Sequence, residues 1–586
     1  GKESAGSENA DGGNSGSGEW NNGEETSSGE KTNISAEKSG RDRFSLLAVN
    51  RHSYGSPLFP QLYIESPLNA LLDKILPEEE LLADEDGTVN ETDNESETVN
   101  DETEKTKDAD NGKGHQHSEE CYKIIYQCRA GVTTMALREG GVANEGDLRS
   151  AITNSSGATI INIAEDFDIT STVEVSSGKN ITIDLQGHTL TYNGTNAADS
   201  MFKVNGGTLT IRDSANEQQG AEKVSEEVVS EAEEASYDET TGRLTYYVTE
   251  CSVNLDGKST TNTIKKYVYD LGINNNANTI GTLDGCDKVT SIITAENGNV
   301  IIDSGCLKNS NGSGIAAKTA NISMNKGYIV NCGIEDKKGG AISLSGGTLM
   351  MIDGVIANND GLQGGAISAE NWATITITGG FIFGNEAKHN GGGIYGSVVK
   401  INIGGSASIV ANKANESGGG IYFTGGNYSF GDEIIRLDIT GGEIIGNTAE
   451  LNGGGIGYLT SSPNKVTPEK PDNKGNRIIQ NAKIKNNHAK RSGGGIYLSG
   501  SELELGGDAS ICANIADLNG GGIYCIVPTE DHIHPNASKN STAKISGNVK
   551  IAANMAKNQP NSYSTDETSQ VSITNHEGYI EKQWFN

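Results

Sequence analysis

The sequence predicts an all-β protein: a right-handed single-stranded parallel β-helix with a disordered N-terminal region. Three observations predict this fold. A phrase close to Asn-x-Ala-x-x-x-Gly-Gly-Gly-Ile-Tyr keeps returning in the second half of the chain. Short runs rich in Ile, Val and Thr, each bounded by Gly or Asn, indicate many short strands. Leucine at fixed offsets, which a leucine-rich horseshoe would require, is scarce.

The repeat has a nearly fixed period. Its Asn residues are Asn331, Asn358, Asn385, Asn412, Asn447, Asn487, Asn514 and Asn554, at steps of 27, 27, 27, 35, 40, 27 and 40 residues. From Asn385 to Asn514, the Asn and the Gly triplet keep a constant separation within the repeat. Two short motifs at a constant separation indicate that one structural unit is repeated and stacked. A unit of 27 residues accommodates two or three short strands, so each unit is expected to form one rung.

We interpret the Asn and Gly positions as structural. Stacked rungs place each Asn above the previous one, where its amide can satisfy backbone groups of the turn. The Gly triplets permit tight packing or positive φ. They lack the strand–helix context and the following Lys-Ser/Thr of a phosphate-binding loop.

The composition excludes some classes of function and partner. The 586-residue chain carries a net charge of −33, which argues against nucleic acid and against anionic membrane surfaces as partners. It has no apolar run of 18 residues, so no membrane insertion is expected. The eight cysteines are an even number compatible with an oxidising, extracellular environment. Because the chain begins at Gly1 without Met, we expect a processed piece of a longer protein.

The N-terminal quarter divides into four segments. Residues 1–40 are mostly Gly, Ser, Glu and Asn, and are expected to be disordered. Residues 41–82 are apolar, with a short helix predicted after Ser66-Pro67. Residues 83–114 form an acidic linker, and residues 115–130 form a Cys/His element.

The Cys/His element admits two interpretations. Its candidate metal ligands are His115, His117, Cys121 and Cys128, which could hold one zinc ion tetrahedrally. The alternative is a Cys121–Cys128 disulfide with exposed histidines, because the spacing matches none of the well-known finger patterns.

Ordered structure is predicted to begin near Asn144. That residue is a candidate N-cap for a short amphipathic helix that would cover the open end of the stack. Residues 144–213 are expected to form this cap and the first rungs. Residues 214–288 are predicted to be an acidic insert with a β-hairpin, residues 289–556 the repeat rungs, and residues 557–586 a frayed tail.

A column of tyrosines is the candidate ligand surface. Its members, each following an Ile that is expected to point inward, are Tyr395, Tyr422, Tyr497 and Tyr524; Tyr458 is displaced by Gly457. Strand alternation then directs the tyrosines outward. Such a ladder could stack sugar rings or form an interface, or it could only stabilise its neighbours. Both interpretations stay open.

Two groups of motifs resemble known families. Gly-Gly-Ala-Ile at 339–342 and 364–367, with Ile-x-x-Asn at 382–385, 409–412, 444–447, 484–487, 511–514 and 551–554, resembles the repeats of polymorphic outer membrane proteins. The His115-to-Cys121 segment and residues 148–213 resemble cell-surface repeat proteins of Gram-positive Firmicutes. The resemblance implies an adhesin-like protein on the bacterial cell surface, with a host glycan or matrix protein as its partner.

Two alternatives to an adhesin remain. Parallel β-helices also carry polysaccharide-cleaving enzymes, which need converging carboxylates. The candidate carboxylates Asp353, Asp360, Asp432, Glu433, Asp438 and Glu443 do not converge in the repeat frame, and the loop Glu530 to His534 is interpreted as exposed. The third possibility is a passive surface stalk. If the chain binds a ligand, its specificity is expected in the loops around 423–437, 459–476 and 526–541.

Overall fold

The computed structural model describes residues 141–580, except 217–220, 234, 239, 254–259, 273–279, 335, 338, 426–428, 431–432, 435, 460–477, 501, 527–540, 558, 566–569 and 577–578. The predicted segments 1–40, 41–82, 83–114 and 115–130 therefore lie outside the described residues, as does the predicted disorder at the N-terminus.

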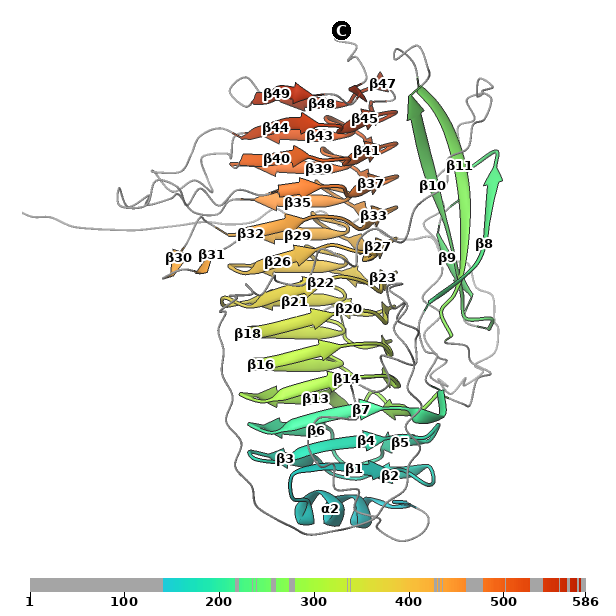
Figure 1. The fold of residues 1–586 in the computed structure, drawn as a ribbon, viewed down its shortest axis with the longest axis vertical. Coiled ribbons are helices and arrows are strands. Elements are labelled where there is room, and N and C mark those ends of the chain that lie inside the picture. The colour runs from blue at the N-terminus through green and yellow to red at the C-terminus, as the bar shows by residue number, and fades with distance from the viewer. Residues whose placement is uncertain are drawn as a thin grey trace, which may run out of the picture. The chain divides into compact units, whose positions relative to one another are not determined.

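A short helix begins the described structure and confirms the predicted cap. Helix α2 spans Glu145–Asn154, and the side chain of Asn144 accepts a hydrogen bond from Asp147 N at 2.9 Å. Leu148, Ala151 and Ile152 are buried on one face of α2. The helix lies across the N-terminal end of the strands (Figure 1), and its buried residues belong to the same hydrophobic core as those of the strands.

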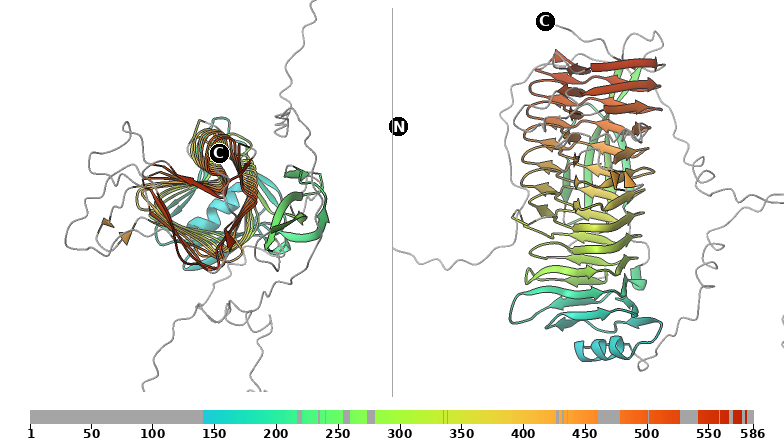
Figure 2. Two further views of the ribbon diagram at one scale, coloured as in Figure 1. Left: turned by 90° about the horizontal axis from the view of Figure 1, so that it is seen from above. Right: turned by 90° about the vertical axis from the view of Figure 1, so that its left-hand side faces the viewer.

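Parallel strands, stacked along one axis, make up most of the fold (Figures 1 and 2). The 13-stranded sheet consists of β2 (Phe167–Ile169), β5 (Thr189–Tyr192), β12 (Thr282–Asp284), β15 (Cys306–Lys308), β17 (Tyr328–Val330), β19 (Val355–Ala357), β23 (Phe381–Phe383), β27 (Ser408–Val410), β33 (Glu443–Ile445), β37 (Lys483–Lys485), β41 (Ser510–Cys512), β45 (Lys550–Ala552) and β50 (Tyr579–Ile580).

A second sheet takes most of the remaining strands. The 23-stranded sheet consists of β1 (Ala158–Asn162), β3 (Val173–Ser176), β4 (Asn180–Asp184), β6 (Ala198–Asn205), β7 (Thr208–Arg212), β13 (Val289–Glu296), β14 (Asn299–Ile302), β16 (Ile315–Met324), β18 (Ile342–Met351), β21 (Ile367–Glu370), β22 (Thr374–Ile377), β25 (Ile394–Ser397), β26 (Lys400–Ile403), β29 (Ile421–Thr424), β32 (Arg436–Ile439), β35 (Ile456–Leu459), β36 (Ile478–Gln480), β39 (Ile496–Ser499), β40 (Glu502–Gly506), β43 (Ile523–Ile526), β44 (Thr542–Gly547), β48 (Tyr563–Thr565) and β49 (Gln570–His576).

The third sheet is built from very short strands. It has eight: β20 (Asp360–Gly361), β24 (Glu386–Ala387), β28 (Lys413–Ala414), β34 (Thr448–Ala449), β38 (His488–Ala489), β42 (Ile515–Ala516), β46 (Met555–Ala556) and β47 (Gln559–Pro560). All its pairings are parallel except that of β46 with β47.

The register follows the sequence repeat. Ile382 of β23 pairs with Ile409 of β27, one repeat later. The longer steps keep the same register, since Ile409 pairs with Ile444 and Ile444 with Ile484. The additional residues of these repeats are therefore accommodated outside the paired strands.

The inner faces of the sheets enclose a continuous aliphatic core. One column, at most 1% exposed, contains Ile329, Ile356, Ile382, Ile409, Ile444, Ile484, Ile511 and Ile551. Full burial of each such side chain contributes roughly 1.5–3 kcal/mol. The alternation of burial, as in the buried and half-buried residues of β22 and β26, is that of strands with one face toward the core.

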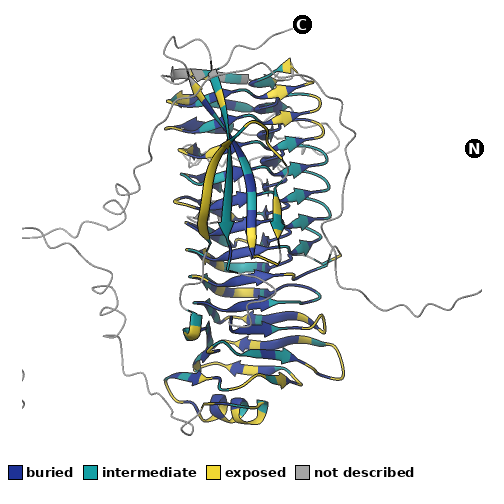
Figure 3. Ribbon diagram, turned by 90° about the vertical axis from the view of Figure 1, so that its right-hand side faces the viewer, coloured by how far each residue is buried: buried dark blue, intermediate teal, exposed yellow. Residues whose placement is uncertain are grey.

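A four-stranded antiparallel sheet lies along the 13-stranded sheet (Figures 1 and 3). Its strands are β8 (Glu222–Val229), β9 (Ser236–Asp238), β10 (Arg243–Val253) and β11 (Thr260–Asp270), in the order β8-β11-β10-β9. Tyr269 packs on Phe381, with ring centroids 4.9 Å apart, and Tyr237 packs on Phe383 at 6.2 Å. A small antiparallel pair, β30 (Ser429–Phe430) and β31 (Glu433–Ile434), lies on the other side of the stack (Figure 2).

Two predicted boundaries are wrong. The tail predicted for 557–586 is not frayed over its described part, because β48 pairs with β43 and β49 with β44, and Tyr563, Val571 and Ile580 pack against the core. These residues lack the Gly triplet but keep enough apolar side chains to cover the last rung. The rungs also resume before residue 289, since β12 pairs with β5 and β15. Across the described residues, no helix has both the length and the apolar character needed to cross a membrane.

Candidate ligand-binding face

A column of buried asparagines fixes the turn between the 13-stranded and eight-stranded sheets. This asparagine ladder contains Asn359, Asn385, Asn412, Asn447, Asn487, Asn514 and Asn554, each at most 1% exposed. The Nδ2 of Asn412 donates to Asn447 Oδ1 at 3.0 Å and to the Ile382 carbonyl at 2.9 Å. The backbone N–H of Asn412 donates to the same Oδ1 at 2.9 Å. Because every amide is satisfied within the ladder, these residues are structural, as the sequence predicted.

The ladder begins one residue later than the sequence suggested. Asn359, and not Asn358, donates to Asn385 Oδ1, and Cys332, next to Asn331, occupies the ladder position one rung earlier. Asn331 and Asn358 instead adopt φ of 52° and 54°. Asparagine tolerates this left-handed conformation better than most residues do, so Asn is suited to both adjacent positions and the sequence cannot separate them.

The four candidate tyrosines do share one column of the 23-stranded sheet. Tyr395 pairs with Tyr422, and Tyr497 pairs with Tyr524. The Tyr395 and Tyr422 rings are stacked, with centroids 5.8 Å apart and planes at 5°. The Tyr497 and Tyr524 rings are 6.0 Å apart and tilted by 40°. All four are half-buried, so part of each ring meets solvent. We call this column the tyrosine face.

Gly457 interrupts the tyrosine face between its two pairs. It is the register partner of both Tyr422 and Tyr497. A Cβ at this position would lie 3.1 Å from Tyr422 Cδ2, because the Tyr422 ring leans over the glycine. The neighbouring Tyr458 points into the core, where it is 2% exposed and stacks on Phe423 at 5.3 Å. The predicted displacement of Tyr458 is therefore a change from the outer to the inner face.

Glu416, whose charge acts on Tyr422, belongs to a small polar cluster. His389 Nδ1 lies 2.8 Å from Glu416 Oε1, and Asn390 Nδ2 donates to Glu416 Oε2 at 2.8 Å. All three side chains are half-buried. Burial, followed by the charges of Tyr395 and Glu416, raises the pKa of Tyr422, so its hydroxyl stays protonated at neutral pH.

This arrangement has the chemistry of a surface that binds sugars or extended chains. Tyrosine rings offer apolar area with a polar end, and they cost little conformational entropy to order. The neighbouring amide and carboxylate groups offer donors and acceptors for hydroxyl groups. The rungs are spaced about 4.8 Å apart, so the face repeats along the stack as the units of a polymer do.

The carboxylates considered for an enzyme site do not converge in the described structure. Asp360 belongs to the eight-stranded sheet, Asp438 to the 23-stranded sheet and Glu443 to the 13-stranded sheet. Asp438 pairs with Arg436, and Glu443 Oε1 lies 2.7 Å from Lys483 Nζ. Asp353 Oδ1 accepts from Gly354 N at a turn. Asp432 lies outside the described residues, and so does the side chain of Glu433.

The predicted zinc ligands His115, His117, Cys121 and Cys128 lie outside the described residues. The loop from Glu530 to His534 also lies outside them, as do most residues of the loops expected around 423–437, 459–476 and 526–541. Where the structure does describe the chain, no group of three or more His, Cys, Asp and Glu side chains is placed to hold a metal ion.

Sequence reasoning missed the docking of the four-stranded sheet. The signal for it lies in β17, β19 and β23, whose three residues are all buried apolar ones. A strand with one face in water alternates apolar and polar residues, as β26 does with Lys400, Ile401, Asn402 and Ile403. Apolar residues on both faces therefore indicate that a second layer covers this part of the stack.

Comparisons with protein-family models, curated proteins and solved structures find no match to this chain.

Proposed function

We propose that this chain is a right-handed single-stranded parallel β-helix that acts outside a bacterial cell as a ligand-presenting, adhesin-like surface protein. Each strand pairs with the equivalent strand of the next repeat, as Ile382 does with Ile409 and Ile409 with Ile444. This pairing supports a single chain that coils by one turn per repeat. Parallel strands joined by crossovers within one sheet are almost always right-handed. The charge of −33 suits a soluble surface protein and opposes binding to nucleic acid.

The observation that carries the proposal is the tyrosine face. Positions inside the stack are fixed by packing and by the asparagine ladder, which leaves them no freedom to bind a partner. The Tyr395–Tyr422 pair lies outside that framework and keeps part of its aromatic area in solvent. Glu416 acts electrostatically on Tyr422, and His389 and Asn390 contact Glu416. We infer a host glycan, or a glycan-bearing matrix protein, as the ligand.

A binding screen tests this proposal. The full chain is applied to immobilised oligosaccharides of neutral, acidic and amino sugars, and to purified matrix proteins with and without enzymatic removal of their glycans. The proposal predicts saturable binding to at least one glycan, and loss of matrix-protein binding after deglycosylation. Absence of saturable binding across the panel would instead favour a passive stalk. Shortening of a bound oligosaccharide, detected by chromatography, would favour an enzyme.

A further inference from the structure

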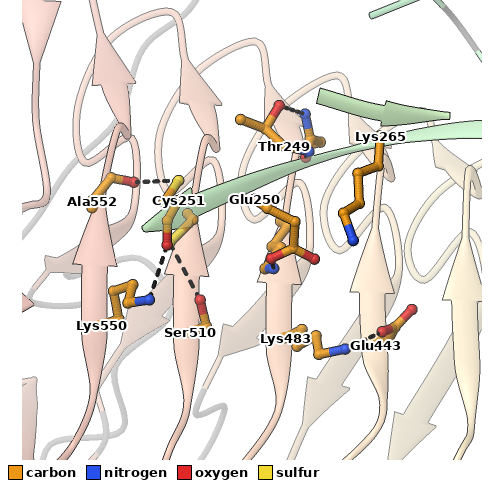
Figure 4. Close-up of polar contacts among 12 residues, drawn as sticks. Thr249, Glu250, Cys251, Lys265, Glu443, Lys483, Ser510, Lys550 and Ala552 are labelled. Carbon is orange, nitrogen blue, oxygen red and sulfur yellow. Dashed lines mark hydrogen bonds and ion pairs between the residues drawn. The ribbon is translucent and has the colours of Figure 1, made fainter. Parts of the chain in front are cut away.

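Two cysteines that are far apart in the sequence meet between the four-stranded sheet and the stack. Cys251 lies on β10 and Cys512 on β41, 512 − 251 = 261 positions later. Together with Ala552 they form a small buried cluster, in which Cys251 is 4% exposed and Cys512 0%. Cys251 Sγ lies 3.9 Å from the Ala552 carbonyl oxygen, and Cys512 Sγ lies 3.3 Å from Ser510 Oγ. The two thiols are close enough for each to shift the pKa of the other. Figure 4 shows Cys251 reaching over the strands that carry Ser510 and Ala552.

The contacts around this pair fix the position of β10 along the stack. Thr249 N donates to Asn486 Oδ1 at 2.8 Å, and Lys550 Nζ donates to the Cys251 carbonyl at 2.9 Å. Between them Glu250 forms an ion pair with Lys485, whose side chain is 3% exposed. Polar contacts on both sides of Cys251 therefore hold β10 in one register. This register places the Cys251 side chain next to Cys512.

Lys485 and Cys512 also occupy neighbouring positions of one column. Lys485 pairs with Cys512, and Cys512 pairs with Ala552. Strand β10 runs across this column. Glu250 forms an ion pair with Lys485, and Cys251 contacts the next two residues of the column, Cys512 and Ala552. Two consecutive residues of β10 therefore contact successive repeats of the stack.

The surroundings also make the two thiols unequal. The hydrogen bond from Cys251 lowers the pKa of Cys512 to about 7 against the effect of burial, with Ser510 and the two nearby lysines helping. The hydrogen bond with Cys512, together with burial, raises the pKa of Cys251. In the docked state Cys512 is therefore the more acidic of the two thiols.

We propose that Cys251 and Cys512 are a disulfide-forming pair that fastens the four-stranded sheet to the 13-stranded sheet. The oxidant is a disulfide such as oxidised glutathione. The thiolate of one cysteine attacks it, forms a mixed disulfide and releases one thiolate. The thiolate of the other cysteine then attacks the sulfur of the first, and the second thiolate leaves. Two cysteine thiols are oxidised, one disulfide is reduced to two thiols, and the protons of the cysteines pass to the released groups.

The reaction takes place when the end of β10 is open. Both sulfurs are buried when the sheet is docked, so a disulfide donor cannot reach them there. Cys251 lies two residues before the end of β10 at Val253, and strand ends open at low free-energy cost. Once formed, the bond holds the sheet in the register that the polar contacts define. The described cysteines outside the pair, Cys286, Cys306, Cys332 and Cys525, all belong to the stack.

Disulfide mapping tests the proposal. The full chain is equilibrated with oxidised and reduced glutathione, alkylated, digested without reductant and analysed by mass spectrometry. We expect a peptide joining Cys251 to Cys512, retained in the Cys286→Ser control. Exposed Cys286 reports whether the oxidant has acted. If Cys286 is glutathionylated while Cys251 and Cys512 are both alkylated as free thiols, or if either pairs with another cysteine, the proposal is overturned.

Hydrogen exchange supplies a second readout that separates fastening from folding. Oxidation is expected to slow exchange of the β10 amides about tenfold or more in the wild-type chain. It should leave them unchanged in Cys251→Ser and in Cys251→Ala, two variants that keep Cys512 in place. Equal slowing in the wild type and in both variants would show that the cross-link does not hold the sheet, and would overturn its fastening role. The outcome is independent of whether a glycan binds.

Discussion

At the scale of single residues, the asparagine ladder shows how one side chain can define a turn. From Asn385 to Asn514, each ladder Oδ1 accepts two hydrogen bonds from the preceding ladder residue, and each Nδ2 donates to the next ladder residue and to an Ile carbonyl of the preceding rung. No other side chain has a donor and an acceptor at this spacing except Gln, which is one methylene longer. The repeat keeps Asn here because a replacement leaves buried groups on two rungs without partners.

Replacing Asn447 by Ala tests this account. The change removes the acceptor of the Asn412 N–H and Nδ2 and the donor to the Ile409 carbonyl. We expect the free energy of unfolding to fall by about 2–5 kcal/mol, since each buried group left unpaired costs about 1–3 kcal/mol. Equilibrium denaturation in guanidinium chloride measures the free energy of unfolding. The control is Asn402→Ala on β26, whose half-buried amide makes one bond to Thr376 Oγ1 at 3.2 Å. Equal losses in the two variants would contradict a special role for the ladder.

The ion pair between Glu250 and Lys485 predicts a pH dependence of sheet docking. Although burial opposes it, the charge of Lys485 lowers the pKa of Glu250 below 4.5. A carboxyl group with a depressed pKa stabilises the docked state above its ordinary pKa, and that contribution is lost as the pH falls through the lower, folded value. Exchange of the β10 amides should therefore accelerate as the pH falls below 4.5. The Glu250→Gln variant should exchange faster at pH 7 and show a smaller change on acidification. An identical acid response in both proteins would reject this assignment.

At the scale of the elements, the Gly triplets allow the rungs to approach each other. A Cβ on Gly419 would lie 2.5 Å from the carbonyl oxygens of Gly454 and Thr448, which are backbone atoms that cannot move aside. Gly418 has φ of 71°, a left-handed conformation. The triplet is thus required for two different reasons, space at one position and backbone conformation at another.

Gly419→Ala is expected to destabilise the stack by about 1–3 kcal/mol, the usual cost of overpacking. Its matched control is Gly446→Asn, at a position with φ of 63° and open space around a Cβ. Asn358 and Asn486 already occupy the same kind of position with φ of 54° and 55°, so the control should unfold close to the wild type. Thermal unfolding of the two variants gives the comparison. A Gly446→Asn protein less stable than Gly419→Ala would contradict the argument from space.

At the scale of the whole molecule, the periodic part of the fold was predictable. Ile382, Asn385 and Gly393 recur at a constant offset, and periodicity is what makes stacked strands visible in a sequence. The hairpin of β10 and β11 was predicted, but its docking was not, because the partners, such as Tyr269 and Phe381, or Cys251 and Cys512, are brought together only by tertiary contacts. The last rung was missed because Tyr563 and Val571 close the stack without the repeat motif.

The sequence predicted the tyrosines of the candidate site but not the polar residues near them. Alternation after Ile394 and Ile421 placed Tyr395 and Tyr422 on the outer face. The polar contact beside the site was not predicted, since it joins His389 and Glu416, which lie 27 positions apart in the sequence, and Glu416 in turn acts on Tyr422.

The most direct test of the central claim is the affinity of tyrosine variants for the glycan found in the screen. Isothermal titration compares the wild-type chain with Tyr395→Ala/Tyr422→Ala and with the control Lys413→Ala, which lies on the eight-stranded sheet. Loss of an aromatic anchor typically costs about 2 kcal/mol or more, so the double variant should bind at least about tenfold more weakly while the control binds as the wild type. A folded double variant with wild-type affinity would contradict the assignment of the tyrosine face as the ligand-binding surface.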